Sequence, residues 1–169
     1  MNYQYINHDE VAALIKSGAV PGKDYQVVDV RDEDFRGGNI PGAINAPSEA
    51  RTEQTVMDLV TKLDQVPKVI FHCTLSQVRG PKNARIYADA VAARTEQSSA
   101  SPSTSTTTTE SSTPASSDQS FSPNPYSNQA GKQQVYVLKD GFGNWQGLYR
   151  NDPQLVENFD SKIWHDFSS

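Results

Sequence analysis

Two short apolar runs rich in β-branched residues, each followed by a segment of helical periodicity, constrain the fold of this chain most strongly. The runs at 25–30 and 68–71 have the length and composition of buried strands. The segments that follow carry apolar residues at helical spacing, Val56, Leu59, Val60 and Leu63 after the first run and Ala84, Ala88 and Val91 after the second. Strands that alternate with helices pair in parallel, so the sequence predicts an α/β fold with a mainly parallel sheet.

Local signals predict further elements around this core. Asn7 and Glu10 have the spacing of a capping box, and the apolar stripe that follows predicts a short amphipathic helix. Ser48 is the expected N-cap of the helix between the two strands. The run at 135–138 predicts another strand, which leads into a Gly-rich turn and a short helix around 145–149.

A Ser/Thr-rich segment interrupts the patterned sequence at about 95–131. It offers almost nothing to bury, so we expect it to be disordered. Closing a longer loop costs only about 0.6 kcal/mol per doubling of its length, and such an insertion is therefore compatible with one domain. We predict a single domain over 1–169 that this segment interrupts.

Charge and cysteine content narrow the classes of function. The formal net charge of -5 and the pI near 5.1 provide no basic excess for nucleic acid or an anionic membrane. No apolar run approaches the roughly 20 residues that span a bilayer, and residues 1–10 lack the apolar centre of a signal peptide. Cys73 is the single cysteine, which favours a reducing cytoplasmic or nuclear compartment. The histidines lack ligand spacing, so we predict no metal.

Residues 69–81 place Cys73 just after a buried strand and just before a helix. Parallel sheets bind ligands where their strands end, and Pro81 suits the first turn of a helix. The helix dipole and its unpaired amides favour an anion there, and together with Arg79 they favour the thiolate form of a cysteine. A guanidinium also binds two oxygens of phosphate or arsenate. We therefore predict that Cys73 is a nucleophile and that Arg79 clamps the oxyanion.

Two neighbours of Cys73 have side chains suited to supporting roles. Ser76 can donate its hydroxyl to the thiolate or to the leaving oxygen, and His72 can tune Cys73 through a hydrogen bond. A lone cysteine after an apolar strand is more often an inert core residue. The five residues that separate Cys73 from Arg79 at a strand-to-helix junction favour chemistry instead.

Segment 72–81 resembles the active-site loop of the rhodanese-like phosphatases, which include the M-phase inducer phosphatases and the related eukaryotic arsenate reductases. Segments 28–31 and 37–45 are similar to the first half of a rhodanese domain, and 137–145 is similar to its closing strand and turn. The resemblance implies a five-stranded, mainly parallel sheet flanked by helices on both faces. It also implies an oxyanion cradle formed by Thr74, Leu75, Ser76, Gln77, Val78 and Arg79.

Loop length separates the activities that this resemblance implies. Sulfurtransferase rhodaneses have a loop one residue shorter, which suits a single sulfur, whereas the loop between Cys73 and Arg79 has room for a tetrahedral oxyanion. The M-phase phosphatases carry a glutamate directly after the cysteine, where this chain has Thr74, so the general acid stays unassigned. Asp32, Glu33 and Asp34 are possible acids by proximity, but we interpret this acidic run more readily as a solvated charged turn.

Asp29 and Arg31 lie at the end of the first buried strand, and their first explanation is a structural one. A charged pair at the end of a buried strand must be hydrogen-bonded to be tolerated. The resemblance implies that these two residues brace the active loop. Phe142 and Trp145 are expected in the core.

Three functions stay open. The first is a cysteine-dependent phosphatase that forms a phosphocysteine intermediate, on protein tyrosine or mixed phosphoesters. The second is an arsenate reductase that binds no cofactor and uses glutathione or glutaredoxin as an external reductant. The third is a non-catalytic rhodanese-like binding module regulated by phosphorylation of the Ser/Thr segment, against which intact Cys73 and Arg79 argue. The expected partner is an oxyanion substrate or a phosphoprotein, with neither nucleic acid nor membrane.

Overall fold

The computed structural model describes residues 3–99 and 133–164, which form one five-stranded sheet with helices on both faces. The strand order is β1-β5-β4-β2-β3, and every neighbouring pair is parallel. The strands are β1 (Gln4–Ile6), β2 (Gln26–Asp29), β3 (Ile44–Asn45), β4 (Lys68–His72) and β5 (Gln134–Leu138). The helices are α1 (His8–Lys16), α2 (Glu53–Lys62), α3 (Arg79–Ser99), α4 (Gly141–Tyr149) and α5 (Ser161–Trp164), with 3-10 turns η1 (Glu33–Phe35) and η2 (Ser48–Ala50). The predicted α/β class and parallel five-stranded sheet are confirmed.

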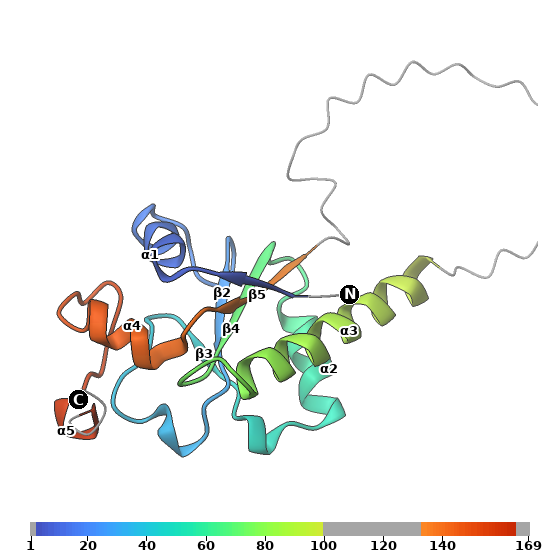
Figure 1. Cartoon of the computed structure of the whole chain (residues 1–169). Helices are drawn as coiled ribbons and strands as arrows, with labels where there is room; N and C mark the ends of the chain where they lie inside the picture. The colour runs from blue at the N-terminus through green and yellow to red at the C-terminus, as the bar shows by residue number, and fades with distance from the viewer. Residues whose placement is uncertain (1–2, 100–132, 165–169) are drawn as a thin grey trace, which may run out of the picture.

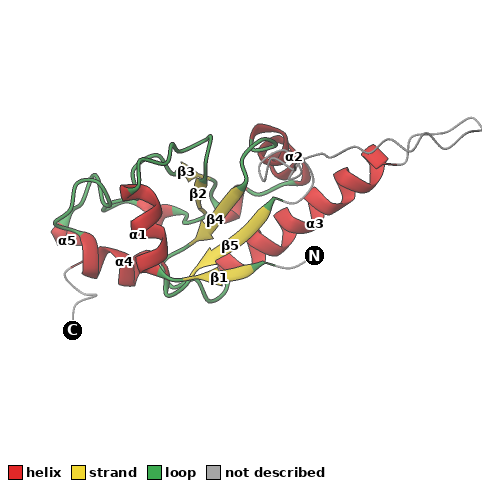
Figure 2. Ribbon diagram, turned by 90° about the horizontal axis from the view of Figure 1, so that it is seen from above, coloured by secondary structure: helices red, strands yellow, loops and turns green. Residues whose placement is uncertain are grey.

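The helices divide between the two faces of the sheet. Successive residues of a strand point to opposite faces, so in β2 Val27 packs on the side of α1 and α4, whereas Val28 packs on the side of α2 and α3. Figure 1 shows these two pairs of helices on opposite sides of the strands, and Figure 2 shows α1, α4 and α5 at one end of the view and α2 and α3 at the other.

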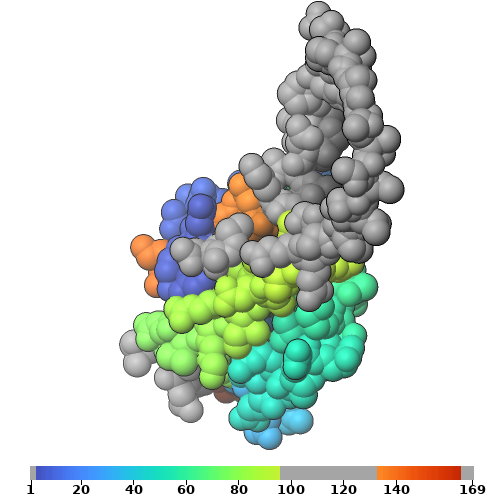
Figure 3. Space-filling view, turned by 90° about the vertical axis from the view of Figure 1, so that its right-hand side faces the viewer, coloured from blue at the N-terminus to red at the C-terminus, as the bar shows by residue number. Residues whose placement is uncertain are grey.

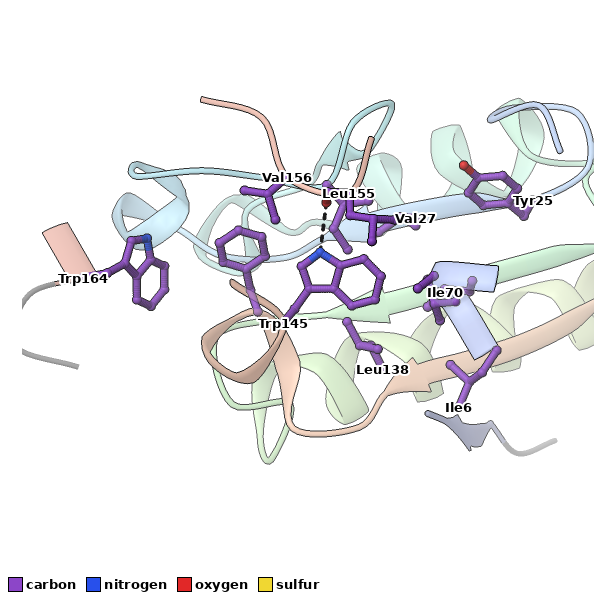
Figure 4. Packing of buried hydrophobic residues seen from close by; sticks show 13 residues of the cluster. Ile6, Tyr25, Val27, Ile70, Leu138, Trp145, Leu155, Val156 and Trp164 are labelled. Atoms are coloured by element: carbon purple, nitrogen blue, oxygen red, sulfur yellow. Dashed lines mark hydrogen bonds between the residues drawn. The ribbon is translucent and has the colours of Figure 1, made fainter. Parts of the chain in front are cut away.

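The core on the α1 and α4 side is built around two aromatic residues. Phe142 and Trp145 are both fully buried, which confirms their predicted place in the core. The Trp145 indole Nε1 donates to the carbonyl of Leu155 at 2.9 Å, a bond drawn in Figure 4. A buried indole needs such a partner, and the bond ties the chain after α4 to this core.

The core on the other face lies under α2 and α3, which lie side by side in Figure 3. The rings of Phe71 and Tyr87 pack with centroids 5.2 Å apart. The Tyr87 hydroxyl donates to Gln133 Oε1 at 2.8 Å, and Gln133 Nε2 donates to the carbonyls of Leu63 and Val66 at 2.7 and 2.6 Å. This chain of bonds joins the end of α2, α3 and the start of β5.

The helix between β2 and β4 begins later than predicted. Ser48 lies in η2, and its hydroxyl donates to Asp32 at 3.2 Å, so the predicted cap is wrong. The N-cap of α2 is Thr52, whose hydroxyl accepts from the Thr55 amide at 3.1 Å. The Thr55 hydroxyl accepts from the Thr52 amide at 2.8 Å in return, which satisfies a second free donor.

Other boundaries agree in part with the sequence. The predicted capping box of α1 is present, with the Asn7 amide donating to Glu10 at 3.0 Å. Helix α4 begins at Gly141, before the expected start, and α3 continues to Ser99. The first residues of the segment predicted as disordered at 95–131 are therefore helical, and the rest of that prediction falls outside the described residues. Within 3–99 and 133–164, no helix has the length and apolar content needed to cross a membrane.

Candidate active site

The predicted catalytic loop joins the end of β4 to the start of α3. Because β4 lies between β2 and β5, the loop emerges at the carboxyl edge of the sheet, where parallel sheets bind ligands. Cys73 is 3% exposed and packs with the core under α2 and α3. The sulfur is therefore held in place at the base of the loop.

The loop backbone turns toward the Cys73 sulfur. The Ser76 amide donates to Cys73 Sγ at 3.1 Å, and the Cys73 amide donates to the Ser76 hydroxyl at 3.4 Å. Ser76 has a φ of 54°, a left-handed conformation that costs a residue other than glycine about 1–3 kcal/mol. In this arrangement the backbone amide of Ser76 donates to the sulfur, and its hydroxyl accepts from the Cys73 amide. Donation from that hydroxyl to a leaving oxygen stays a prediction.

Two carboxylates hold Arg79 at the side of the loop. Arg79 Nη2 donates to Asp34 Oδ2 at 2.6 Å, and Nη1 donates to Asp34 Oδ1 at 2.9 Å and to Asp32 Oδ2 at 3.2 Å. Asp34 Oδ2 also accepts from Thr74 Oγ1 at 2.6 Å. The acidic run at 32–34 is therefore not the solvated turn that we predicted, because two of its carboxylates contact the active loop and its arginine.

These contacts change the electrostatics of both partners. Burial alone would raise the pKa of Asp34, but hydrogen bonds from Arg79 and Thr74 and the charge of Arg79 hold that pKa well below its ordinary value. The hydrogen bonds to Asp34 raise the pKa of Arg79 above its ordinary value. At neutral pH the carboxylate is ionised and occupies the guanidinium fork.

The N-terminus of α4 fixes the other side of the loop. The Phe142 amide donates to the Cys73 carbonyl at 2.9 Å, and the Gly143 amide donates to the Thr74 carbonyl at 2.8 Å. Gly141 has a φ of 63°, and a Cβ there would come within 2.7 Å of the Cys73 carbonyl oxygen and closer still to that of Thr74. Gly141 is not among the predicted site residues. The available signal was a glycine separated from the end of β5 by two polar residues, Lys139 and Asp140.

Asp29 and Arg31 form a fully buried ion pair behind the loop. Arg31 Nε donates to both Asp29 oxygens at 2.9 and 3.0 Å, and Nη2 donates to Oδ2 at 2.6 Å. The guanidinium also donates to the carbonyls of Asp34 at 3.2 Å and Gly38 at 2.8 Å, and lies 4.2 Å from the ring centroid of Phe142. The pair thus contacts both the turn that carries Asp34 and the start of α4.

His72 is buried beside this pair. Its Nδ1 lies 3.1 Å from the Cys73 carbonyl oxygen, which assigns the ring proton to Nδ1. Its Nε2 has no hydrogen-bond partner within the described part of the chain and lies 3.6 Å from Asp29 Oδ2. Burial lowers the pKa of His72 despite the opposing charge of Asp29, so the ring is neutral at neutral pH. The hydrogen bond between His72 and Cys73 is therefore made through the Cys73 carbonyl.

A cavity of about 430 Å³ opens over the loop. It brings the predicted nucleophile and clamp together with Asp34 and with two apolar residues that the sequence did not point to, Ile163 and Trp164 of α5. Ser76 lies buried, and His72, Asp29 and Arg31 lie fully buried, outside the lining. The lining residues are Asp34, Cys73, Thr74, Leu75, Gln77, Val78, Arg79, Ile163 and Trp164. Among residues 3–99 and 133–164, no group of three or more His, Cys, Asp or Glu side chains could hold a metal ion.

Comparisons with known proteins point to one family. Residues 7–148 match the model of the family described as Rhodanese-like domain. The chain is 33% identical over 137 residues to the dual specificity phosphatase ibp1 of Schizosaccharomyces pombe, an alignment that covers 79% of this chain and 83% of that protein.

Two further likenesses involve proteins named for arsenic. The chain is 46% identical over 69 residues to arsenical-resistance protein 2 of Saccharomyces cerevisiae, which covers 37% of this chain and 53% of that protein. Its fold matches the As-Sb reductase from Leishmania major with a TM-score of 0.61 and 26% sequence identity, over 92% of this chain and 85% of that one.

Proposed function

Since this chain belongs to the rhodanese-like domain family, we propose that it is an enzyme in which Cys73 attacks a tetrahedral oxyanion, with a phosphate ester as the substrate. The relatives include a dual specificity phosphatase aligned over most of both chains. The substrates in this proposal are phosphotyrosine or mixed phosphoesters of proteins.

One arrangement carries the proposal. Cys73, which is 3% exposed, lines a cavity together with Arg79, and a five-residue loop with a left-handed Ser76 joins the two. A nucleophile and a planar cation on the same short loop fit an anion that has several oxygens around one reacting atom. The cavity volume of about 430 Å³ leaves space beside the loop for the group that the oxyanion is attached to.

The chemistry follows from these positions. The Cys73 thiolate attacks the phosphorus, and the ester oxygen leaves on the side opposite the sulfur. Loop amides and Arg79 stabilise the charge that develops on the remaining oxygens. Water then attacks the phosphocysteine, which releases phosphate and restores the thiolate.

Arsenate reduction is the second candidate, favoured by the likeness to the As-Sb reductase and to the arsenical-resistance protein. Here Cys73 attacks arsenate and water leaves, which forms a cysteine-arsenate adduct. The chain has a single cysteine, so an external thiol, glutathione or glutaredoxin, supplies the electrons that reduce arsenic. Neither reaction requires a bound cofactor, and a reducing cytoplasm or nucleus suits both.

Two assays on the purified chain separate the candidates. The first supplies para-nitrophenyl phosphate, and the second supplies arsenate with glutathione and glutaredoxin. Phosphatase turnover that vanishes in Cys73→Ser, with an unchanged melting temperature, is the expected result. Turnover in the arsenate assay alone would make the chain a reductase, and activity that survives Cys73→Ser would remove Cys73 from either reaction.

A further inference from the structure

The loop that carries Cys73 has no carboxylic acid to protonate a leaving oxygen. Residues 74–78 contain no carboxylate, and Thr74 directly follows the nucleophile. An ester oxygen that leaves with the electron pair of its broken bond needs a proton unless the leaving group is already stable as an anion. The acid must therefore come from another part of the cavity.

Asp34 is the one carboxylic acid among the described residues that line the cavity. It comes from η1, and its carboxylate reaches the loop by accepting from Thr74 Oγ1 at 2.6 Å. The side chain is 39% exposed, whereas Cys73 is 3% exposed, so the acid stands nearer the mouth of the cavity than the nucleophile does. An in-line displacement directs the leaving oxygen away from the sulfur, toward that mouth.

The surroundings of Asp34 hold its position. The backbone amide of Asp32 donates to Asp34 Oδ1 at 2.9 Å, and the buried Arg31 donates to the Asp34 carbonyl at 3.2 Å. Arg31 of the buried pair thus holds the backbone of the turn at Asp34, and the Thr74 hydroxyl holds the Asp34 carboxylate. Such support from a second layer of contacts is what a group that transfers protons requires.

We propose that Asp34 is the general acid of this enzyme and, after the leaving group has departed, its general base; the proposal rests on the phosphatase reaction above. The Thr74 hydroxyl holds the Asp34 carboxylate close to Cys73, whereas loop residues 74–78 contain no carboxylate of their own.

Binding of the substrate leads to protonation of Asp34. Before substrate enters, the Arg79 fork is bonded to Asp34 and Asp32, and Asp34 is ionised. A phosphate dianion takes the fork for two of its own oxygens, so Asp34 loses its principal cation and faces new negative charge from the substrate. Of the other charged groups, Asp32 adds negative charge, while Arg31 contacts the backbone of Asp34 and pairs with Asp29. Asp34 therefore takes up a proton as the complex forms.

The two steps then balance. In the first, the S–P bond to Cys73 forms, the P–O ester bond breaks, and the Asp34 proton moves to the leaving oxygen. In the second, Asp34 accepts a proton from water as the water oxygen bonds to phosphorus and the S–P bond breaks. Phosphate and the thiolate are the products, and no electrons are exchanged with another molecule.

The test compares two esters that differ in their need for an acid. Phenyl phosphate has a poor leaving group, like tyrosine, whereas para-nitrophenyl phosphate has a good one. For Asp34→Asn we expect kcat/KM for phenyl phosphate to fall about 100-fold or more and kcat/KM for the nitrophenyl ester to fall much less. Glu33→Gln removes the same charge from an exposed neighbour in the same turn and should leave both values unchanged.

Thr74→Val removes the hydroxyl that positions Asp34 while keeping the carboxylate, and keeps the test decisive if Asp34→Asn fails to fold. We expect kcat/KM of this variant to fall about 10-fold for phenyl phosphate and to stay unchanged for the nitrophenyl ester. Equal losses for both esters in these variants, or faster turnover, would overturn the role of Asp34. A wild-type chain that hydrolyses neither ester would instead overturn the phosphatase reaction, and this proposal with it.

Discussion

Gly141→Ala tests whether the N-terminus of α4 positions the active loop. A methyl group at this residue would overlap the carbonyl oxygens of Cys73 and Thr74, and the φ of 63° disfavours alanine as well. Alanine in a left-handed conformation costs roughly 1–2 kcal/mol, and each of the two amide-carbonyl bonds that the overlap would break contributes about 1 kcal/mol. We therefore expect the free energy of unfolding to fall by about 3–4 kcal/mol, measured by urea denaturation.

The effect on turnover should exceed the effect of lost stability. To make room, the Cys73 and Thr74 carbonyls must move, and a displacement of about 1 Å in a catalytic group can lower the rate about 100-fold. We expect kcat/KM for para-nitrophenyl phosphate to fall by that factor at a temperature where the variant is still folded, as circular dichroism reports.

Gly147→Ala provides the matched control in the same helix. A Cβ at Gly147 meets nothing within 4 Å, and alanine stabilises a helix by about 0.5–1 kcal/mol relative to glycine. This variant should be at least as stable as the wild type and equally active. If Gly141→Ala retained wild-type activity, the bonds from α4 would not be what holds the loop in place.

Three further predictions follow from the charged residues around the site. Arg79→Lys should lower kcat/KM for the nitrophenyl ester about 100-fold or more in steady-state assays, because an ammonium cannot bind two oxygens in one plane. Asp29→Asn leaves the buried Arg31 without its counter-charge and should reduce the free energy of unfolding in urea by about 3–5 kcal/mol. The pKa of Asp34 is lower in the folded state than in the unfolded state, where it is about 4. Its pairing with Arg79 therefore stabilises the fold above about pH 4, and this stabilisation is lost as the pH falls from there toward the folded-state pKa. The difference in the free energy of unfolding between wild type and Asp34→Asn should shrink as the pH is lowered below about 4, measured by denaturation at each pH.

Each of these has an outcome that contradicts it. Normal kcat/KM in the Arg79→Lys variant would mean that the guanidinium does not bind the oxyanion. Asp29→Asn should be compared with Lys16→Gln, which breaks the pair of an exposed lysine with the half-exposed Asp152 and should leave the denaturation midpoint nearly unchanged. A stability difference for Asp34→Asn that stays constant from neutral to acid pH would show that the Asp34 pair does not stabilise the folded state.

Much of the fold was predictable because its central elements have strong patterns. Strands β2, β4 and β5 are apolar runs buried on both faces, which a sequence reveals directly. The edge strands β1 and β3 have three and two residues and partly exposed side chains, so they carry no pattern of their own. Their place in the sheet depends on pairing with β5 and β2, which is a tertiary effect.

The site residues that are close in the sequence were predictable, whereas those that only the fold brings together were not. Cys73 and Arg79 stand on one loop at a strand-to-helix junction, so their spacing alone indicated them. Asp34 contacts Thr74 from 40 positions away, and its charge looked like an ordinary solvated turn. Gly141 meets the loop because β5 lies beside β4 and delivers α4 to the same edge of the sheet.

The pairing of Arg79 with Asp34 and Asp32 also bears on how the enzyme behaves toward its own product. Orthophosphate has to separate the guanidinium from two carboxylates before it can occupy the fork, and that separation offsets part of its affinity. In the proposed phosphatase reaction the ester meets the same cost, so the two carboxylates lower the affinity of the fork for both anions. The fork is therefore retained only by an anion whose oxygens replace the contacts that Arg79 makes with Asp34 and Asp32.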